Sequence, residues 1–193
     1  MGFFIGLLLS YLAIPENLKN RHSVVFGPQI IDISNLKEGS IDFYMWDNIP
    51  IGVYRRTEKE ISYLLKFRTE VRDKMSEKQI QKKWLGDTFD RISNNSINSV
   101  WMKSKTRSIK EDVFVFIMKS PIRGCTVIKS IYQRSSRRGM PMSGFKNYFI
   151  DTCTHQGFDL AGRIFINHYY NTHLLIPNHR YIDENTIELV PNE

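Results

Sequence analysis

The stretch Phe149-Ile-Asp-Thr-Cys-Thr-His-Gln-Gly-Phe-Asp-Leu-Ala-Gly-Arg-Ile164 decides how this chain is interpreted. It contains one of the two cysteines, Cys153, and it ends in an aromatic-Asp-x-x-Gly-Arg segment, residues 158–163. The other cysteine ends the segment Lys119-Ser-Pro-Ile-Arg-Gly-Cys125, which follows the hydrophobic run 113–118. Each cysteine therefore lies next to an apolar segment, and these two segments are the candidate functional loops.

The two segments resemble the cluster-binding loops of the Rieske iron–sulfur proteins, the high-potential subunits of cytochrome bc1 complexes. In that family the first loop reads Cys-x-His-x-Gly-Cys. The second reads Cys-Pro-Cys-His-Gly-Ser and is closed by an aromatic-Asp-x-x-Gly-Arg turn. The segment 158–163 fits this turn without a gap and fixes the register of the second loop. The four ligand positions of the family are then occupied by Ser120, Ile122, Asp151 and Thr154.

A Rieske centre needs two thiolates on one iron and two imidazoles on the other. None of the four substituted residues offers a thiolate or an imidazole. The resemblance therefore implies a Rieske fold that holds no [2Fe–2S] cluster. Cys125 and Cys153 match the non-ligand cysteine pair of the family, so the resemblance also implies a disulfide between the two loops.

Three other interpretations of the cysteines stay open. Cys153-Thr-His-Gln-Gly157 also fits the first-loop pattern, so a slipped register would offer one cysteine and one histidine to a cluster. Tetrahedral zinc accepts mixed sulfur and nitrogen ligands. A zinc site would combine both cysteines with His155 and one of His168, His173 and His179. In the third interpretation the two cysteines are buried free thiols.

The composition sets broad limits on the fold and the partners. The 193 residues suit one domain with an appendage. Hydrophobic residues at 41% can form a core, and aromatic residues at 12% suit a β-rich one. A net charge of +7 favours anionic lipid, acidic protein surfaces or nucleic acid as partners.

The N-terminus begins with an uncharged apolar run at 3–14, which Pro15 ends. As a helix, these dozen residues would reach about 18 Å, whereas the hydrocarbon core of a bilayer is about 30 Å thick. The run resembles a shortened form of the N-terminal membrane anchor of Rieske proteins; an ordinary buried helix is the alternative. We predict an anchor helix at 1–20, with lipid or partner contacts at Phe3, Phe4 and Leu7, and a linker at 21–29.

Residues 30–193 are predicted to form a mainly β, Rieske-type antiparallel β-sandwich head. Residues 40–46 alternate as a half-buried strand does, and a turn follows at 47–48. Thr57 is a helix N-cap with Glu60 at the capping-box position. Arg55 and Arg56 are expected at a solvated strand end. Residues 181–189 resemble the final hairpin of the family, with its turn at 183–185.

Two further segments complete the predicted head. Residues 66–111 form a helical, polar insertion in which Ile80, Trp84, Leu85 and Phe89 are spaced as one face of a helix. Residues 112–170 form the degenerate cluster-binding subdomain. Between its loops, a basic segment offers contacts to lipid headgroups through Arg134, Arg137 and Arg138.

The resemblance implies a non-redox accessory subunit of a respiratory membrane complex, most simply complex III or a supercomplex that contains it. It would have no catalytic activity of its own and would contact neighbouring subunits near cytochromes b and c1 and anionic lipid. Nucleic acid is not expected as a partner. The expected location is the mitochondrial inner membrane with the head on the intermembrane side, or an alphaproteobacterial inner membrane with a periplasmic head. The alternatives are a binding module of another assembly, such as the mitochondrial ribosome, and a residual metal or redox protein.

Overall fold

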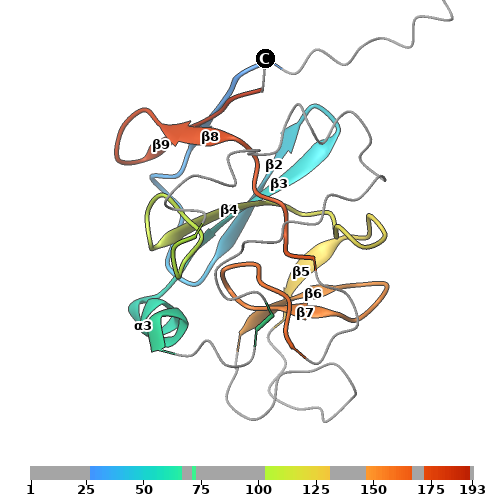
Figure 1. Cartoon of the computed structure of the whole chain (residues 1–193). Helices are drawn as coiled ribbons and strands as arrows, with labels where there is room; N and C mark the ends of the chain where they lie inside the picture. The colour runs from blue at the N-terminus through green and yellow to red at the C-terminus, as the bar shows by residue number, and fades with distance from the viewer. Residues whose placement is uncertain (1–26, 67–70, 73–102, 131–146, 167–171, 192–193) are drawn as a thin grey trace, which may run out of the picture.

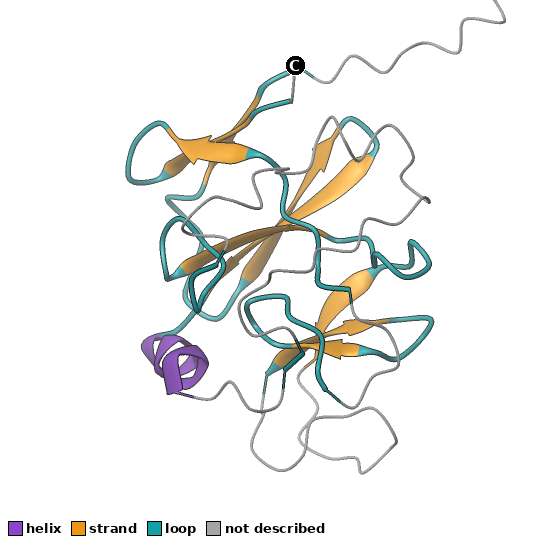
Figure 2. Cartoon of the chain, viewed as in Figure 1, coloured by secondary structure: helices purple, strands orange, loops and turns teal. Residues whose placement is uncertain are grey.

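The computed structural model describes residues 27–66, 71–72, 103–130, 147–166 and 172–191 (Figure 1). Within these ranges the fold is mainly β, with three three-stranded antiparallel sheets and one short helix (Figure 2). The predicted mainly β fold is confirmed at this level. In the same ranges, no helix has the length and apolar character needed to cross a membrane.

The first sheet has the order β2-β3-β4. The alternating segment forms β2 (Ile41–Trp46), which turns through Asp47, at a φ of 52°, into β3 (Ile49–Arg55). The third strand, β4 (Val113–Ile117), pairs with β3 in a register that places Val53 opposite Val115. The predicted strand and turn at 40–48 are therefore confirmed.

The second sheet joins the two ends of the described chain in the order β1-β9-β8. In it β1 (Gln29–Asp32) pairs with β9 (Thr186–Leu189), which also pairs with β8 (His179–Tyr181). The turn between β8 and β9 is closed by Asp183, whose Oδ1 accepts the N–H of Asn185 at 2.8 Å. The predicted final hairpin is thus confirmed, and β1 begins one residue before the predicted start of the head.

A first hydrophobic core involves residues of these two sheets. Ile31 and Ile187 from the second sheet belong to the same buried cluster as Ile51, Val53 and Val115 from the first. Alternation along each strand directs one set of side chains into this core. The opposite face of β4 carries Phe114 and Phe116 into a second core.

The third sheet lies against this second core and carries the second candidate loop. Its order is β5 (Val127–Ser130), β6 (Tyr148–Asp151) and β7 (Gly157–Phe158). Phe149 of β6 packs on Phe116 with ring centroids 4.7 Å apart and meets Tyr54 edge-on at 5.6 Å. Aromatic packing thus fixes the third sheet, and with it the loop between β6 and β7, against the first sheet.

Helix α3 (Glu58–Lys66) begins with the predicted capping box. Glu60 N donates to Thr57 Oγ1 at 3.3 Å, and Thr57 N donates to Glu60 Oε2 at 2.9 Å. The Glu60 carboxylate is buried and also accepts hydrogen bonds from Tyr54 at 2.8 Å and Asn147 at 2.6 Å. Lys129 of β5 donates to the Tyr54 hydroxyl at 2.7 Å. One polar network therefore connects the helix, the first sheet and the third sheet.

Several predictions lie outside the described residues. These are the anchor at 1–20 with Phe3, Phe4 and Leu7, most of the linker, the arginines Arg134, Arg137 and Arg138, and the helical face with Ile80, Trp84, Leu85 and Phe89. They stay predictions.

Candidate functional site

The two candidate loops lie at the ends of buried strands and are closed by their own backbone. The first loop follows β4, and Ser120 N donates to Cys125 O at 2.7 Å across it. Gly124 has a φ of 73°, a value that favours glycine. The second loop joins β6 to β7, where Asp151 N donates to Gln156 O at 2.9 Å. Each loop is therefore a compact turn.

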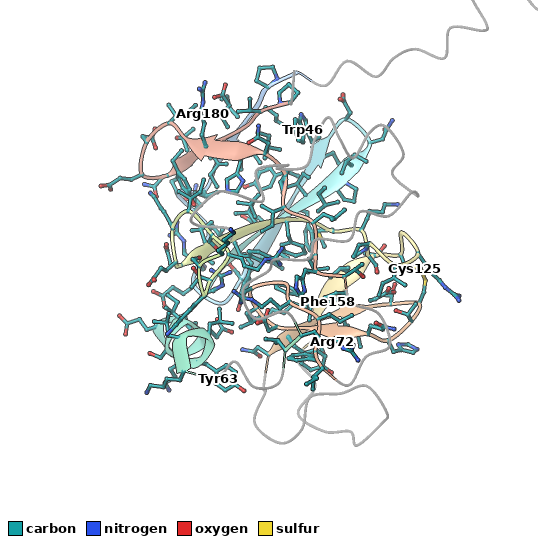
Figure 3. All side chains as sticks on the ribbon, viewed as in Figure 1. Trp46, Tyr63, Arg72, Cys125, Phe158 and Arg180 are labelled. Atoms are coloured by element: carbon teal, nitrogen blue, oxygen red, sulfur yellow. A yellow bond between two sulfur atoms is a disulfide. The ribbon has the colours of Figure 1, made fainter. Side chains whose placement is uncertain are left out.

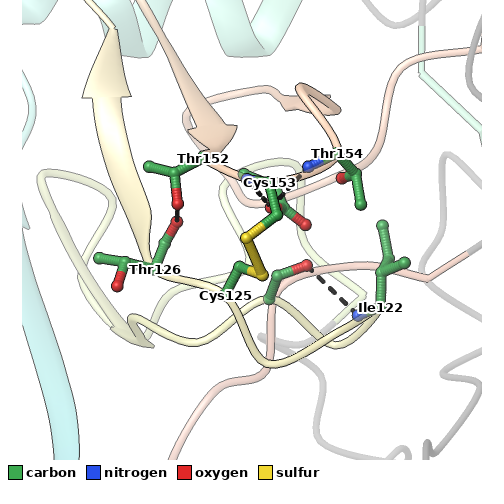
Figure 4. The surroundings of a disulfide bond; sticks show 8 residues. Ile122, Cys125, Thr126, Thr152, Cys153 and Thr154 are labelled. Atoms are coloured by element: carbon green, nitrogen blue, oxygen red, sulfur yellow. Dashed lines mark hydrogen bonds between the residues drawn. A yellow bond between two sulfur atoms is a disulfide. The ribbon is translucent and has the colours of Figure 1, made fainter.

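A disulfide between Cys125 and Cys153 joins the loops (Figure 4). The two Cα atoms are 6.0 Å apart, and the two cysteines are 28 positions apart in the sequence. Beside the disulfide, the backbone N–H and the hydroxyl of Thr152 both donate to Thr126 O, at 3.1 and 3.0 Å. Both cysteines lie in the described part of the chain and neither is free, so the implied disulfide is confirmed.

Asp151, at a ligand position of the Rieske pattern, is fully buried beneath the disulfide. Its Oδ1 accepts the N–H groups of Cys153 at 2.8 Å and Thr154 at 3.1 Å, which orders the start of the second loop. Its Oδ2 is also buried but accepts no hydrogen bond from the described residues. Oδ1 thus holds the backbone of the second loop, whereas Oδ2 can still accept a hydrogen bond or bind a cation.

The pKa of the Asp151 carboxyl lies below its ordinary value. Burial raises this pKa, but the hydroxyls of Ser120 and Thr154 and the N–H groups of Cys153 and Thr154 lower it more. The two hydroxyls lie close enough to stabilise the anion, although neither donates a hydrogen bond to Oδ2 in this structure. Asp151 is therefore a carboxylate at neutral pH.

The other substituted positions have local structural roles. Ser120 is buried, and its Oγ accepts the N–H of Ile122 at 3.3 Å. The side chain of Ile122 belongs to the second hydrophobic core. Thr154 and Ile122 lie on the same side of the disulfide in the close-up view (Figure 4). The fold thus brings the four sequence-predicted positions around one disulfide.

The residues around the disulfide do not fit a [2Fe–2S] cluster of the Rieske type. Both sulfur atoms are joined to each other, so neither is a thiolate. The substituted positions offer two hydroxyls, one carboxylate and one aliphatic side chain, whereas the centre needs two imidazoles besides two thiolates. His155 follows in the second loop but is exposed.

The zinc site considered from the sequence is not assembled among the described residues. His173 is buried, and its Nδ1 accepts the N–H of Ile164 at 3.1 Å. His179 is also buried, and its Nδ1 lies 2.8 Å from Pro177 O. The ligand atoms that do lie together, within 4.8 Å of one another, belong to Cys125, Asp151 and Cys153. Asp151 is the member of this group that the zinc interpretation missed.

The turn that fixed the register, residues 158–163, closes the second loop. Asp159 Oδ1 accepts the N–H groups of Ala161 at 2.9 Å and Arg163 at 2.7 Å. Gly162 has a φ of 72°, and a Cβ atom there would lie 2.8 Å from Phe114 Cζ. Phe158 at the start of the turn packs in the second core (Figure 3). Asp159 therefore closes the turn through hydrogen bonds, and Gly162 supplies the backbone conformation and the space that the turn needs.

Three buried arginines hold this turn: Arg56 and Arg107 from outside it, and Arg163 from its own last position. Arg56 Nε donates to Leu160 O at 3.0 Å, and its other nitrogens reach Thr106 O, Ser108 Oγ and Glu111 O. Arg107 Nη1 donates to Ala161 O at 2.9 Å. Arg163 donates to Lys105 O at 2.7 Å and Ser104 O at 2.6 Å. The segment 103–112 is thereby fixed to the closing turn.

The expectation of a solvated Arg56 is wrong. Its side chain is only 1% exposed and lies over the Phe114 ring, with the guanidinium carbon 5.0 Å from the centroid. Burial lowers the pKa of Arg56 to about 10, so the guanidinium stays charged at neutral pH. Carbonyl oxygens from distant segments satisfy its donors, and that compensates for its desolvation. No local signal marks these acceptors, and the same holds for Arg107.

The comparison with curated proteins supports the family suggested by the loops. The chain is 28% identical over 182 residues to the ubiquinol–cytochrome c reductase iron–sulfur subunit of Allochromatium vinosum. The match covers 94% of this chain and 78% of that protein. No known family model matches the chain. The chain is therefore a distant homologue of a Rieske iron–sulfur subunit, which relates it to a component of complex III.

Proposed function

We propose that this chain is a redox-silent, Rieske-derived structural subunit of a respiratory membrane complex, most simply the cytochrome bc1 complex or a supercomplex that contains it. The observation that carries the proposal is the state of the four ligand positions. Asp151 and Ser120 accept backbone N–H groups of the loops, Ile122 packs in the second core, and the Cys125–Cys153 disulfide joins the two loops. These contacts and the disulfide support the shape of the loops, and the four ligand positions contribute no thiolate or imidazole.

The homology supports the setting of the proposal. The similar protein is named as a subunit of ubiquinol–cytochrome c reductase, and the match extends over most of both chains. A subunit that keeps the fold keeps surfaces on which neighbouring subunits can bind, even when its inherited site has lost the chemistry. We therefore propose partners among the subunits near cytochromes b and c1, and no catalytic activity of the isolated chain.

The proposed location is the mitochondrial inner membrane, with the head on the intermembrane side. A disulfide fits an oxidising compartment. The alternative is an alphaproteobacterial inner membrane with a periplasmic head, which presents the same chemical environment. In both cases the short apolar run at 3–14 would contact lipid or partner helices.

The decisive experiment is purification of the native assembly in mild detergent, followed by a subunit inventory, haem spectra and metal analysis of the chain. We expect haem b and c bands with cytochromes b and c1. We also expect neither iron nor acid-labile sulfide in the isolated chain and no Rieske-type EPR signal from it. Two irons and two sulfides per chain would refute the redox-silent role.

A second candidate function rests on the net charge of +7. Such a charge suits a module recruited to an RNA-containing assembly such as the mitochondrial ribosome. The same purification separates the two candidates, because co-purifying ribosomal RNA without haem would support the ribosomal role and contradict the respiratory one.

A further inference from the structure

The group formed by Cys125, Cys153 and Asp151 has a property that a purely structural disulfide does not need. A carboxylate oxygen of Asp151 lies within 4.8 Å of both sulfur atoms. The Asp151 side chain is fully buried, and its Oδ2 accepts no hydrogen bond from the described residues. A buried carboxylate oxygen without a partner is costly, so its persistence calls for an explanation. Two cysteine sulfurs and a carboxylate oxygen are a donor set that a zinc-type cation accepts, and Asp151 has one oxygen not engaged by the loop.

We propose that reduction of the Cys125–Cys153 disulfide creates a binding site for one zinc-type divalent cation, with both thiolates and the Asp151 carboxylate as ligands. The fourth position of the tetrahedron is left to water. The site belongs to the reduced chain alone, since the oxidised sulfurs are joined to each other. This inference goes beyond the proposed structural role and does not depend on it.

The redox step balances with a dithiol or a phosphine as the reductant. A phosphine takes the oxygen of one water molecule and becomes the phosphine oxide, and that water supplies the two thiol protons. A dithiol transfers two electrons and two protons to the S–S bond, which breaks into two thiols, while the dithiol closes into its own disulfide. The cation then displaces both thiol protons to solvent and binds the two thiolates. Cys153 is exposed and Cys125 is half-buried, so a reductant can reach the bond from solvent.

The geometry allows the same loops to hold the cation. Zinc–sulfur bonds of about 2.3 Å in a tetrahedron place two thiolates about 3.8 Å apart. The Cα atoms are 6.0 Å apart, so side-chain rotation can supply this separation. The loops also stay neighbours without the disulfide, because Thr152 donates twice to Thr126 O. Asp151 Oδ1 keeps its bonds to Cys153 and Thr154 while Oδ2 turns to the metal.

The test uses the full chain in mild detergent, reduced with a phosphine, and titrated with Co²⁺ in place of Zn²⁺. We expect one Co²⁺ per chain with a thiolate-to-cobalt charge-transfer band, displacement of Co²⁺ by Zn²⁺, and no binding by the oxidised chain. Absence of the band in the reduced chain, or equal binding by the oxidised chain, would overturn the proposal.

The contribution of Asp151 is tested with Asp151→Asn, which keeps an oxygen for the two loop N–H groups. Loss of an outer-sphere partner alone costs about tenfold in metal affinity. We therefore expect the loss of a direct ligand to weaken Co²⁺ binding by at least about tenfold. The matched control is Asp183→Asn at the exposed β8–β9 turn, which should bind as the unmodified chain does. Equal affinity of both variants would refute the role of Asp151.

Two measurements on the unmodified chain do not depend on the variants. Zinc X-ray absorption should show two sulfur ligands and lighter ligand atoms, whereas four sulfur ligands would indicate a site shared between unfolded or aggregated chains and would refute the proposal. Zn²⁺ should also raise the unfolding temperature of the reduced chain. A decrease would mean that the cation prefers the unfolded chain, which contradicts the proposed site.

Discussion

Alanine at Gly162 should be among the most destabilising small substitutions in this protein. The substitution has two destabilising effects, one on the backbone conformation and one on the packing. Gly162 has a φ of 72°, and an L-residue in the left-handed region costs about 1–2 kcal/mol. The new Cβ would also lie 2.8 Å from Phe114 Cζ and 3.0 Å from Leu174 Cβ, and Leu174 Cβ cannot move without its backbone. Forcing a methyl group into such a packed core costs about 1–3 kcal/mol more. The expected total is about 2–5 kcal/mol.

Three other glycines separate these two costs. Gly39 has a φ of 74° but no steric conflict, since the nearest atom to its Cβ would be Thr57 Cγ2 at 3.5 Å, an ordinary van der Waals contact. Gly52 has no positive φ but would meet the Phe116 ring at 2.9 Å. Gly27 has neither problem. Its Ala variant therefore measures only the reduced flexibility of the unfolded chain, which stabilises by about 0.4–1 kcal/mol.

The assay is urea unfolding of the four oxidised Ala variants in one mild detergent, followed by intrinsic fluorescence. Relative to Gly27→Ala, we expect about 1–2 kcal/mol from Gly39→Ala by its φ alone. We expect about 1–3 kcal/mol from Gly52→Ala by its contacts alone. Gly162→Ala should lose close to the sum of these two values. If Gly162→Ala lost no more than Gly39→Ala, the reasoning on the contacts with Phe114 and Leu174 would be refuted.

Further substitutions and a pH titration test other parts of the fold. Replacement of both Cys125 and Cys153 by serine opens a loop of about 28 residues and should lower the free energy of unfolding by about 3–4 kcal/mol. Denaturant titrations measure this loss. A loss below about 1 kcal/mol would contradict a stabilising disulfide between the two loops. Burial lowers the pKa of His179 from 6.5 to about 4. Between these two pH values the imidazole is protonated in the unfolded chain but neutral in the folded chain. The free energy of unfolding must therefore fall as pH falls from about 6.5 to about 4. Replacement of His179 by Gln should flatten this part of the stability–pH profile, and an unchanged slope would assign it to other groups. Arg56→Met leaves several buried carbonyls without a donor and should cost about 3–5 kcal/mol. Arg180→Met removes an ion pair to Glu188 whose arginine is exposed, and it should cost less than about 1 kcal/mol. Similar losses in the two variants would contradict the buried role of Arg56.

Local sequence patterns predicted those parts of the fold whose partners lie within a few residues. The capping box of α3 joins Thr57 to Glu60, and the β8–β9 turn depends on Asp183 two residues before Asn185. Such contacts are set by spacing along the backbone, so spacing reveals them. The disulfide was the exception, because its loops are distant in sequence. The resemblance to a family implied it, and no local rule did.

Tertiary structure alone decided which polar groups became buried and what they contact. Arg56 follows a strand and was expected in solvent, but the fold places Leu160 O, 104 residues away, against its guanidinium. Asp151 was identified only as a substituted ligand position, and the tertiary structure placed its carboxylate beneath the disulfide with one oxygen unused. The sequence by itself thus determined the strand and turn at 40–48, the start of α3 and the final hairpin through short-range geometry, and the family resemblance through the motifs of its two loops. Burial and partner choice arise from contacts between distant segments, and only the folded chain brings those segments together.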